Sequence, residues 1–438
     1  MHCSIDIVIS TLGKLDSDKG TQSVEAITHN SFHFKRFATM FRTMLQRPEA
    51  RLFFIISVLF FICIHSIDAF LAPMMINQGI EPQVMGLIMG AGGLATLLIR
   101  FPLGVISDVI KSRKIFIQLS LLLPIVAWPL AWLEPNAVTL YLAKAADGVT
   151  AATWVLYNIL FIRYFDRSEA PAAVAMLALA GPIGVFLGNC IGGLLINYFA
   201  NNIAFFLSCI SALLALALTT RIRDVHNPIK VPTIKACIDG TRKQITDSSI
   251  WLIGILATIV ILVPFATRDT LTPIYAEQLG ARAGILTILS NLHLIFYALA
   301  IALCSSVFYR RIGLVKTALV GILLQAISTL GIPFTHSLTV IYFLQALAGF
   351  SFGMAFAAFM SLSIVNTTAD EQSTRMGLFQ TIYSSGMFVG PVVMGIMLQH
   401  INLASGYILI TILSIAAAVV TPLSARLVYS RSGLTPHR

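Results

Sequence analysis

Charged residues are scarce in this 438-residue chain. Asp, Glu, Lys and Arg make up 11% of it, whereas hydrophobic residues make up 57%. Soluble globular domains carry about 25% charged residues and have too little interior for so much apolar surface. The apolar residues occur in repeated runs of about 20, the length of a helix that crosses a bilayer, and alternating ten-residue barrel strands are absent. The composition therefore predicts an all-α integral membrane protein.

Other missing signals exclude further classes. The opening "MHCSIDIVISTLGKLDSDKG" lacks the basic start, apolar core and cleavage site of a signal peptide, so we expect the first spanning helix to insert the protein. The six cysteines show no CxxC or Cys/His ligand spacing, so we expect buried thiols, no metal site and no cofactor. No HExxH, Gly-x-Ser-x-Gly or GxxxxGK[ST] motif is present, which argues against a membrane enzyme and against an ATP-driven pump.

Twelve apolar runs predict twelve transmembrane helices, an even number that puts both chain ends on one side. Of the 29 Lys and Arg, 25 fall in segments on that side. The positive-inside rule then places both termini in the cytoplasm of a multi-pass protein of the cell (inner) membrane. The excess of Lys and Arg is therefore explained by membrane topology, and we expect no nucleic-acid partner. The predicted spans are 52–76, 83–106, 115–133, 137–161, 171–195, 203–220, 249–275, 283–307, 316–334, 338–362, 376–398 and 404–425.

The spans form two halves that resemble each other at an offset near 200 residues. "DAFLAPMMINQ" aligns Asp68 with Arg268 in "RDTLTPIYAEQ", and "LYLAKAADG" aligns Gly148 with Gly349 in "IYFLQALAG". Many secondary transporters are built from such repeats, with the substrate site between them near the midplane. The predicted organisation is a cytoplasmic segment 1–50, a six-helix bundle 51–220, a cytoplasmic linker 221–248, a six-helix bundle 249–426 and a cytoplasmic tail 427–438.

Ahead of the first span, "FHFKRFATMFRTMLQR" predicts an amphipathic helix at about 32–47. Phe and Met side chains share one helical face and Lys and Arg occupy the rest. This pattern is typical of a helix lying on the anionic inner leaflet. A targeting or partner-binding role is the alternative.

The turn after the second span, "RFPLGVISDVIKSRK", resembles the loop motif of the major facilitator superfamily. The matching residues are Gly104, Asp108, Arg113 and Lys114, preceded by Arg100 in the form Arg-x-Pro-x-Gly. The resemblance covers about residues 50–428. It implies two pseudo-symmetric six-helix bundles and secondary transport, with this loop acting as a cytoplasmic gate. An ordinary basic turn that obeys the positive-inside rule is the alternative.

Gly181-Pro182 in the fifth span is similar to the Gly-Pro kink of the family's antiporters, although Val185 and Phe186 replace the usual Gly-Gly. A bend with close helix packing would need no export function.

Ionisable residues inside apolar spans are costly and mark functional sites. Counted along their helices, Asp68, Lys144 and Arg268 lie at matching depth. His65 and Asp147 lie one turn deeper, and Asp269 and His293 are further candidates. The resemblance implies that the first, fourth, seventh and tenth helices line the central cavity. The strongest candidates all lie on three of these four helices.

These side chains suggest roles. Asp68 and Asp147 are the candidates for proton coupling, with His65 as a relay, because a carboxylate that loses and regains a cationic partner takes up and releases a proton. Lys144 and Arg268 would compensate them or bind an anionic group of the substrate. The alternative is permanent structural pairing, Lys144 with Asp147 and Asp68 with Arg268. The candidates for a substrate-facing surface are Trp154, Gln345, Tyr383, Tyr157, Tyr297 and Gln380, and helix packing is the alternative for each of them.

The sequence thus predicts a monomeric secondary transporter that moves a small organic solute across the lipid bilayer by alternating access. Two cations in the expected cavity favour an anionic or zwitterionic solute, and Gly181-Pro182 favours proton-coupled export. The alternatives are proton symport of an organic acid, metal chelate or sugar, a facilitator without coupling, and direct metal-ion transport through His65 and Asp68. A sensor that has a transporter fold but moves nothing is the alternative from another class.

Overall fold

The computed structural model describes residues 46–110, 112–165, 170–199, 203–222, 242–365, 367 and 369–430. These residues form helices and turns and no strand. The expected amphipathic helix at 32–47 lies almost wholly outside them. The first half contains α3 (Pro48–His65), α4 (Asp68–Asn77), α5 (Pro82–Ile110), α6 (Arg113–Leu133), α7 (Ala137–Ala152), α8 (Trp154–Ile162), α9 (Ala170–Ala178), α10 (Ala180–Tyr198) and α11 (Ala204–Thr219).

The second half has the same arrangement. It contains α13 (Ser248–Ala266), the π-helix η2 (Thr267–Leu271), α14 (Thr272–Gln278), α15 (Ala283–Leu303), the π-helix η3 (Cys304–Phe308), α16 (Tyr309–Arg311), α17 (Leu314–Gly331), the 3-10 helix η4 (Ile332–Phe334), α18 (Leu338–Ile364), α19 (Ala369–His400) and α20 (Leu403–Ser430).

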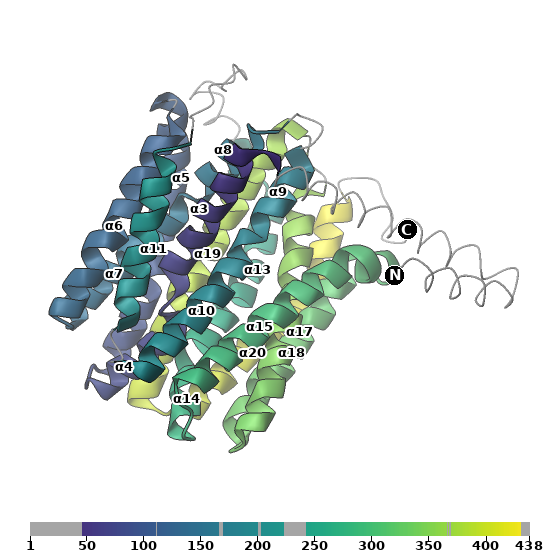
Figure 1. Cartoon of the computed structure of the whole chain (residues 1–438). Helices are drawn as coiled ribbons and strands as arrows, with labels where there is room; N and C mark the ends of the chain where they lie inside the picture. Colours follow the sequence, from purple (N-terminus) through teal and green to yellow (C-terminus); the bar gives the residue numbers. More distant parts are fainter. Residues whose placement is uncertain are drawn as a thin grey trace, which may run out of the picture.

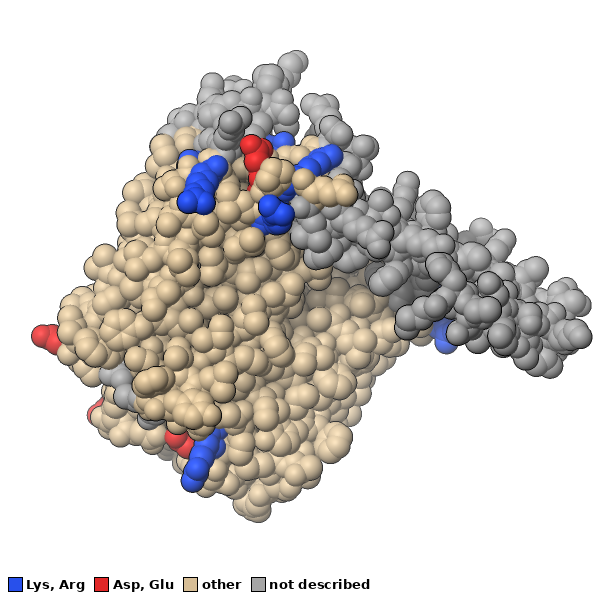
Figure 2. Space-filling model, viewed as in Figure 1, with Lys and Arg blue, Asp and Glu red and all other residues tan. Residues whose placement is uncertain are grey.

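The twelve predicted spans are confirmed. Among the described residues, eleven helical stretches are long and apolar enough to cross a membrane, and α11 supplies a shorter apolar twelfth. We call the end of the bundle where α3 begins and α20 ends the terminal face, and the other end the opposite face. Figure 1 shows the helices running between these faces, with α4 and α14 at the opposite face. In Figure 2, Lys and Arg gather toward the terminal face, while the broad surface between the faces is uncharged.

The repeat seen in the sequence extends to the helix crossings. Gly148 of α7 packs against the backbone of Gly92 on α5, and Gly349 of α18 packs against the backbone of His293 on α15. A Cβ atom at Gly148 or at Gly349 would overlap a backbone carbonyl of the facing helix, so both crossings require glycine. The first helix of each half is also interrupted at the same place. Its α-helical path breaks between α3 and α4 in the first half and at η2 in the second.

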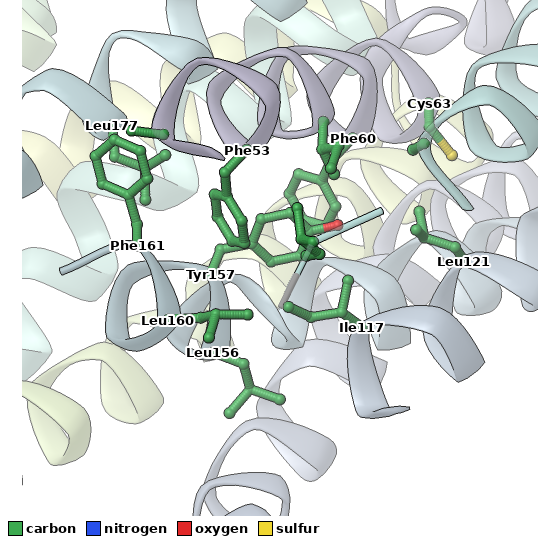
Figure 3. Packing of buried hydrophobic residues seen from close by; sticks show 14 of the residues in the cluster. Phe53, Phe60, Cys63, Ile117, Leu121, Leu156, Tyr157, Leu160, Phe161 and Leu177 are labelled. Atoms are coloured by element: carbon green, nitrogen blue, oxygen red, sulfur yellow. The ribbon is translucent and has the colours of Figure 1, made fainter. Parts of the chain in front are cut away.

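The core of the first half is aromatic. Tyr157 of α8 packs with Phe53 and Phe60 of α3, at ring-centroid distances of 5.5 and 4.6 Å, and Phe161 lies beside Phe53 (Figure 3). Tyr157 is fully buried in this core. This position agrees with the alternative that Tyr157 is a packing residue, because its helical face turns toward α3.

The two halves meet through glycines of α5 and through polar side chains at the opposite face. Gly86, Gly90 and Gly93 approach the backbone of α19. The Asn77 amide donates to both carboxylate oxygens of Glu277 at 3.1 Å, joining the ends of α4 and α14. These contacts hold the halves together at the opposite face.

Candidate functional site

Four side chains of the first half form the charge cluster, which we define as His65, Asp68, Lys144 and Asp147. Lys144 Nζ lies 2.7 Å from Asp68 Oδ1 and 3.7 Å from Asp147 Oδ2. His65 Nδ1 lies 2.7 Å from the other oxygen of Asp68, Oδ2. The relative exposure of Asp68, Lys144 and Asp147 is 8%, 6% and 3%. The structure therefore brings together all three proton-coupling candidates and one of the two predicted cations.

Local backbone geometry explains the cluster. The break at Ser66 and Ile67 ends α3 after His65 and starts α4 at Asp68, so this carboxylate lies in the first turn of a helix, where the helix dipole favours negative charge. Lys144 and Asp147 are three residues apart on α7, on one face of the helix. The cluster thus spans the junction of α3, α4 and α7.

Trp128 of α6 completes the cluster and was missed in the sequence. Its indole Nε1–H donates to Asp147 Oδ1 at 3.0 Å, and its ring is fully buried against Phe205. The other oxygen of Asp147, Oδ2, makes no hydrogen bond with any residue in the described ranges. A tryptophan in an apolar span gives no sign of its partner, so only the folded chain could reveal this contact.

The formal charges of the cluster do not cancel. Two carboxylates face one ammonium, so the sum is −1 while His65 is neutral. An uncompensated charge in a buried site costs several kcal/mol. Binding one proton removes this excess charge.

In the second half, Arg268 pairs with its own neighbour. Its Nε and Nη2 donate to the two oxygens of Asp269 at 2.6 and 2.8 Å. On a regular α-helix adjacent side chains diverge by about 100°, but both residues lie in η2, whose π-helical turn lets them meet. Such π-bulges are frequent at functional sites. The alternative that Asp68 pairs with Arg268 is not what the structure shows, since Asp68 binds Lys144 and His65.

A small pocket adjoins Arg268, and we call it the Arg268 pocket. In this conformation its free space is enough for about one water molecule, so a larger occupant requires the pocket to widen. Gln345, a predicted substrate-facing residue, lines it and donates from Nε2 to Thr272 Oγ1 at 3.0 Å. The remaining lining residues are Ala69, Arg268, Thr272, Pro273, Leu286, Leu289 and Ser290.

Two other predicted substrate-facing residues lie among aromatic side chains. Trp154 contacts Phe61 at a centroid distance of 4.7 Å, and Tyr383 contacts Phe356 at 5.2 Å. Both remain partly exposed. Their packing explains their positions without a substrate, and a contact with substrate stays a prediction.

One of the predicted gating residues contacts the other half of the protein, whereas another makes its contacts within its own half. Arg100 Nη1 donates to Ser384 Oγ at 3.4 Å, joining α5 to α19. Lys114 instead donates to the carbonyls of Thr220 and Ile222, just after α11 in its own half. Arg113 is buried at the start of α6. Gly104 and Asp108 lie on α5, and their surroundings are outside the described part of the structure.

The predicted kink of the fifth span is visible in the backbone. The helix is interrupted at Leu179, between α9 and α10, directly before Gly181 and Pro182. Gly181 faces the ring of Phe61, and Gly184 faces the α3 backbone at Val58. The bend therefore lets α10 approach α3 closely.

A polar contact between α10 and α15 was also missed in the sequence. Asn189 Nδ2 donates to Ser290 Oγ and to Asn291 Oδ1, each at 3.0 Å. Thr287 Oγ1 donates to the Asn189 carbonyl at 3.2 Å. The isolated Asn and Ser residues in these two apolar runs could have indicated this contact, because polar residues in membrane helices commonly form hydrogen bonds to neighbouring helices.

Comparison with known proteins agrees with this architecture. The family model of the Major Facilitator Superfamily matches residues 53–280 and 255–436. The chain belongs to the major facilitator superfamily. No curated protein matches it. Its membership makes it a multi-pass membrane protein with a transporter fold.

Solved transporters share this superfamily fold at low sequence identity. A mutant of the nucleoside transporter NupG has a TM-score of 0.70 and 11% identity, covering 85% of this chain and 99% of that one. A bacterial homologue of the human lysosomal transporter Spinster, inward-facing and unoccupied, has a TM-score of 0.68 and 14% identity, covering 88% and 98%. Its occupied form has a TM-score of 0.65 and 15% identity, covering 88% and 97%. These likenesses establish the twelve-helix fold.

Proposed function

We propose that this superfamily member is a proton-coupled secondary transporter that moves a small polar organic solute by alternating access. The observation that carries the proposal is the charge cluster, whose formal charges sum to −1 in a buried site. A cluster one proton short of neutrality is suited to binding one proton per cycle, because neutralisation lowers the cost of burial.

Asp147 is the group we assign to that proton. Both oxygens of Asp68 have a partner at 2.7 Å, whereas within the described ranges Asp147 Oδ2 has only the more distant ammonium of Lys144, at 3.7 Å. A proton on Asp147 Oδ2 would leave Lys144 paired with Asp68. After its release, Lys144 would be attracted by both carboxylates, which changes the forces between α4 and α7. Trp128 would position Asp147 throughout.

His65 is the proposed relay. With Nδ1–H donating to Asp68, its Nε2 carries the lone pair that could accept a proton. The side chain is 24% exposed, the most exposed of the cluster. Contacts such as Asn77 with Glu277 close the opposite face, so we propose that protons reach His65 from the terminal face. The excess of Lys and Arg on that face supports its assignment as cytoplasmic, and we propose the cell (inner) membrane as the location.

The solute is proposed to be zwitterionic or neutral and polar. The expectation of an anionic solute depended on two available cations. Lys144 and Arg268 are both paired with carboxylates, so neither offers an uncompensated positive charge. The bend at Gly181-Pro182 supports export by antiport, and symport is distinguished from it by the sign of the proton flux.

The test is proton flux in proteoliposomes with uridine, xylose, glycine and citrate as candidate solutes. We expect the wild type to move protons with a solute and Asp147→Asn to lose that coupling. Glu134→Gln is the matched control, because it makes the same change at an exposed turn outside the cluster. Coupled flux in Asp147→Asn would refute the assignment of the proton to this residue. Absence of any solute movement in the wild type would favour a sensor.

A further inference from the structure

His293 on α15 is a buried side chain that the proton mechanism does not use. It is 2% exposed, and neither ring nitrogen makes a hydrogen bond within the described residues. The Gln345 side chain of α18 lies within interaction distance of the ring, but the two groups are not aligned as a hydrogen bond. Gln345 is 1% exposed, and its Oε1 also lacks a partner there, although its Nε2 donates to Thr272. Three unpaired polar atoms therefore lie together between α15 and α18.

Such a group is unusual in a native protein. More than about nine in ten buried polar groups are hydrogen-bonded. An unpaired one is destabilising, so several in adjacent side chains indicate a place where a water molecule or a ligand supplies the missing hydrogen bonds. The position of His293 is fixed by packing. Its backbone lies against Gly349 of α18, and its ring centroid lies 6.1 Å from that of Phe352.

The Arg268 pocket shows where such a ligand would lie. Gln345 lines this pocket from α18, and Ser290 lines it one turn from His293 on α15. Ala69 of α4 contributes the wall from the first half. An occupant would therefore touch both halves, as a transported solute must when it biases their relative position.

The chemistry of the lining favours an uncharged occupant. A neutral imidazole offers one donor and one acceptor, and Gln345 Oε1 offers a second acceptor. Arg268 adds donors but its charge is matched by Asp269. With the charge cluster at −1 nearby, an anion would meet net repulsion. Leu286, Leu289 and Pro273 supply an apolar wall.

We infer that His293 and Gln345, together with the Arg268 pocket, form a subsite that binds an uncharged group with both hydrogen-bond donors and acceptors, such as a carboxamide on a small ring. The inference rests on the proposed function because it names the chemistry of the transported solute. Its test uses no Asp147 variant and no proton flux, so either proposal can fail without the other.

The first measurement is the melting temperature of His293→Leu in detergent without solute. Replacing an unpaired buried imidazole by an apolar side chain of similar size is neutral or stabilising. We expect the melting temperature to stay level or to rise. A lower melting temperature, or a variant that does not fold, would show that the imidazole is already satisfied and would overturn the inference. Gln325→Leu, on α17 away from the pocket, is the control: the buried Gln325 amide donates to the Val260 carbonyl at 3.1 Å, so this variant loses a hydrogen bond and should melt at a lower temperature than His293→Leu.

The second measurement compares matched neutral and anionic probes. Nicotinamide and nicotinate, and benzamide and benzoate, differ chiefly in carboxamide against carboxylate. We expect at least one amide to raise the melting temperature of the wild type and of Gln325→Leu more than its acid does, and this rise to vanish in His293→Leu. An equal or larger effect of the acids, an amide effect that survives in His293→Leu, or no effect of either amide would overturn the inference.

Discussion

Among the described residues, Lys144 is the one cation paired with both carboxylates of the charge cluster, so its removal is the most informative perturbation. Lys144→Met keeps the length and the apolar part of the side chain but leaves Asp68 and Asp147 facing each other. The formal charge of the cluster changes from −1 to −2. We expect a large loss of stability at neutral pH and a smaller loss at acidic pH, because protonation of the carboxylates removes the added charge.

The distances in the cluster set the magnitude. At an effective dielectric constant of about 20, the gross attraction of Lys144 is about 6 kcal/mol to Asp68 at 2.7 Å and about 4.5 kcal/mol to Asp147 at 3.7 Å. Desolvation of the ammonium offsets much of this. Removing one partner of a buried ion pair costs about 3–5 kcal/mol, which is the expected decrease in the free energy of unfolding.

The assay is unfolding of purified protein in detergent between pH 5 and pH 8, with the double variant Lys144→Met/Asp68→Asn beside the single one. The double variant keeps one carboxylate, so its charge returns to −1 and its stability should recover in part. Asp68→Asn alone brings the cluster to zero and should lose coupled proton flux, whereas the double variant should regain it. A Lys144→Met variant as stable as the wild type at pH 8, or equally destabilised at every pH, would refute the charge argument.

Three further predictions concern packing and gating. Gly148→Ala should lower the free energy of unfolding by about 1–3 kcal/mol because its Cβ overlaps the Gly92 carbonyl, while Gly284→Ala, with open space around it, should change little; thermal unfolding of both decides. Asn189→Ala removes two hydrogen bonds between α10 of the first half and α15 of the second. The ratio of molecules open at the opposite face to molecules closed there should then rise by about tenfold for each 1.4 kcal/mol lost. Distances between spin labels at that face measure the shift, and unchanged distance distributions would contradict it. Arg375→Met should cost about 3 kcal/mol, since Arg375 is buried and donates to Asp247 at 2.7 Å. Burial acts to raise the pKa of the Asp247 carboxyl, but the Ser249 amide and Arg375 lower it below its usual value. The contribution is therefore present at pH 5 and pH 7 alike and lost only in stronger acid, so a penalty that already disappears at pH 5 would show that this ion pair is not its source.

The sequence predicted the spans well because each depends on local composition. The second helix was predicted at 83–106 and extends from Pro82 to Ile110, and the seventh was predicted at 249–275 and extends from Ser248 to Gln278. The sequence also predicted the repeat. Gly148 and its counterpart Gly349 lie at equivalent helix crossings, of α7 with α5 and of α18 with α15. Glycine has one strong use in a membrane helix, close approach of backbones, so its position alone is informative.

The sequence did not predict which of the buried charged residues pair with each other. Sequence spacing placed Asp68 and Arg268 at equal depth, yet the break after His65 directs Asp68 toward Lys144. The π-helical turn of η2 directs Arg268 toward Asp269. Both effects depend on backbone irregularities of a few residues, which periodic patterns do not encode.

The sequence by itself determined that this chain crosses a membrane twelve times, in two related halves, with ionisable side chains on a few helices. Hydropathy and repetition are properties of the chain, and they hold before any helix meets another. The tertiary structure alone decided which charges pair and that Trp128 supports Asp147. It also decided that both ring nitrogens of His293 and the Oε1 atom of Gln345 lack hydrogen-bond partners among the described residues, near the Arg268 pocket. These outcomes depend on helices brought together from distant parts of the chain, where a shift of about 1 Å separates a hydrogen bond from an unpaired group.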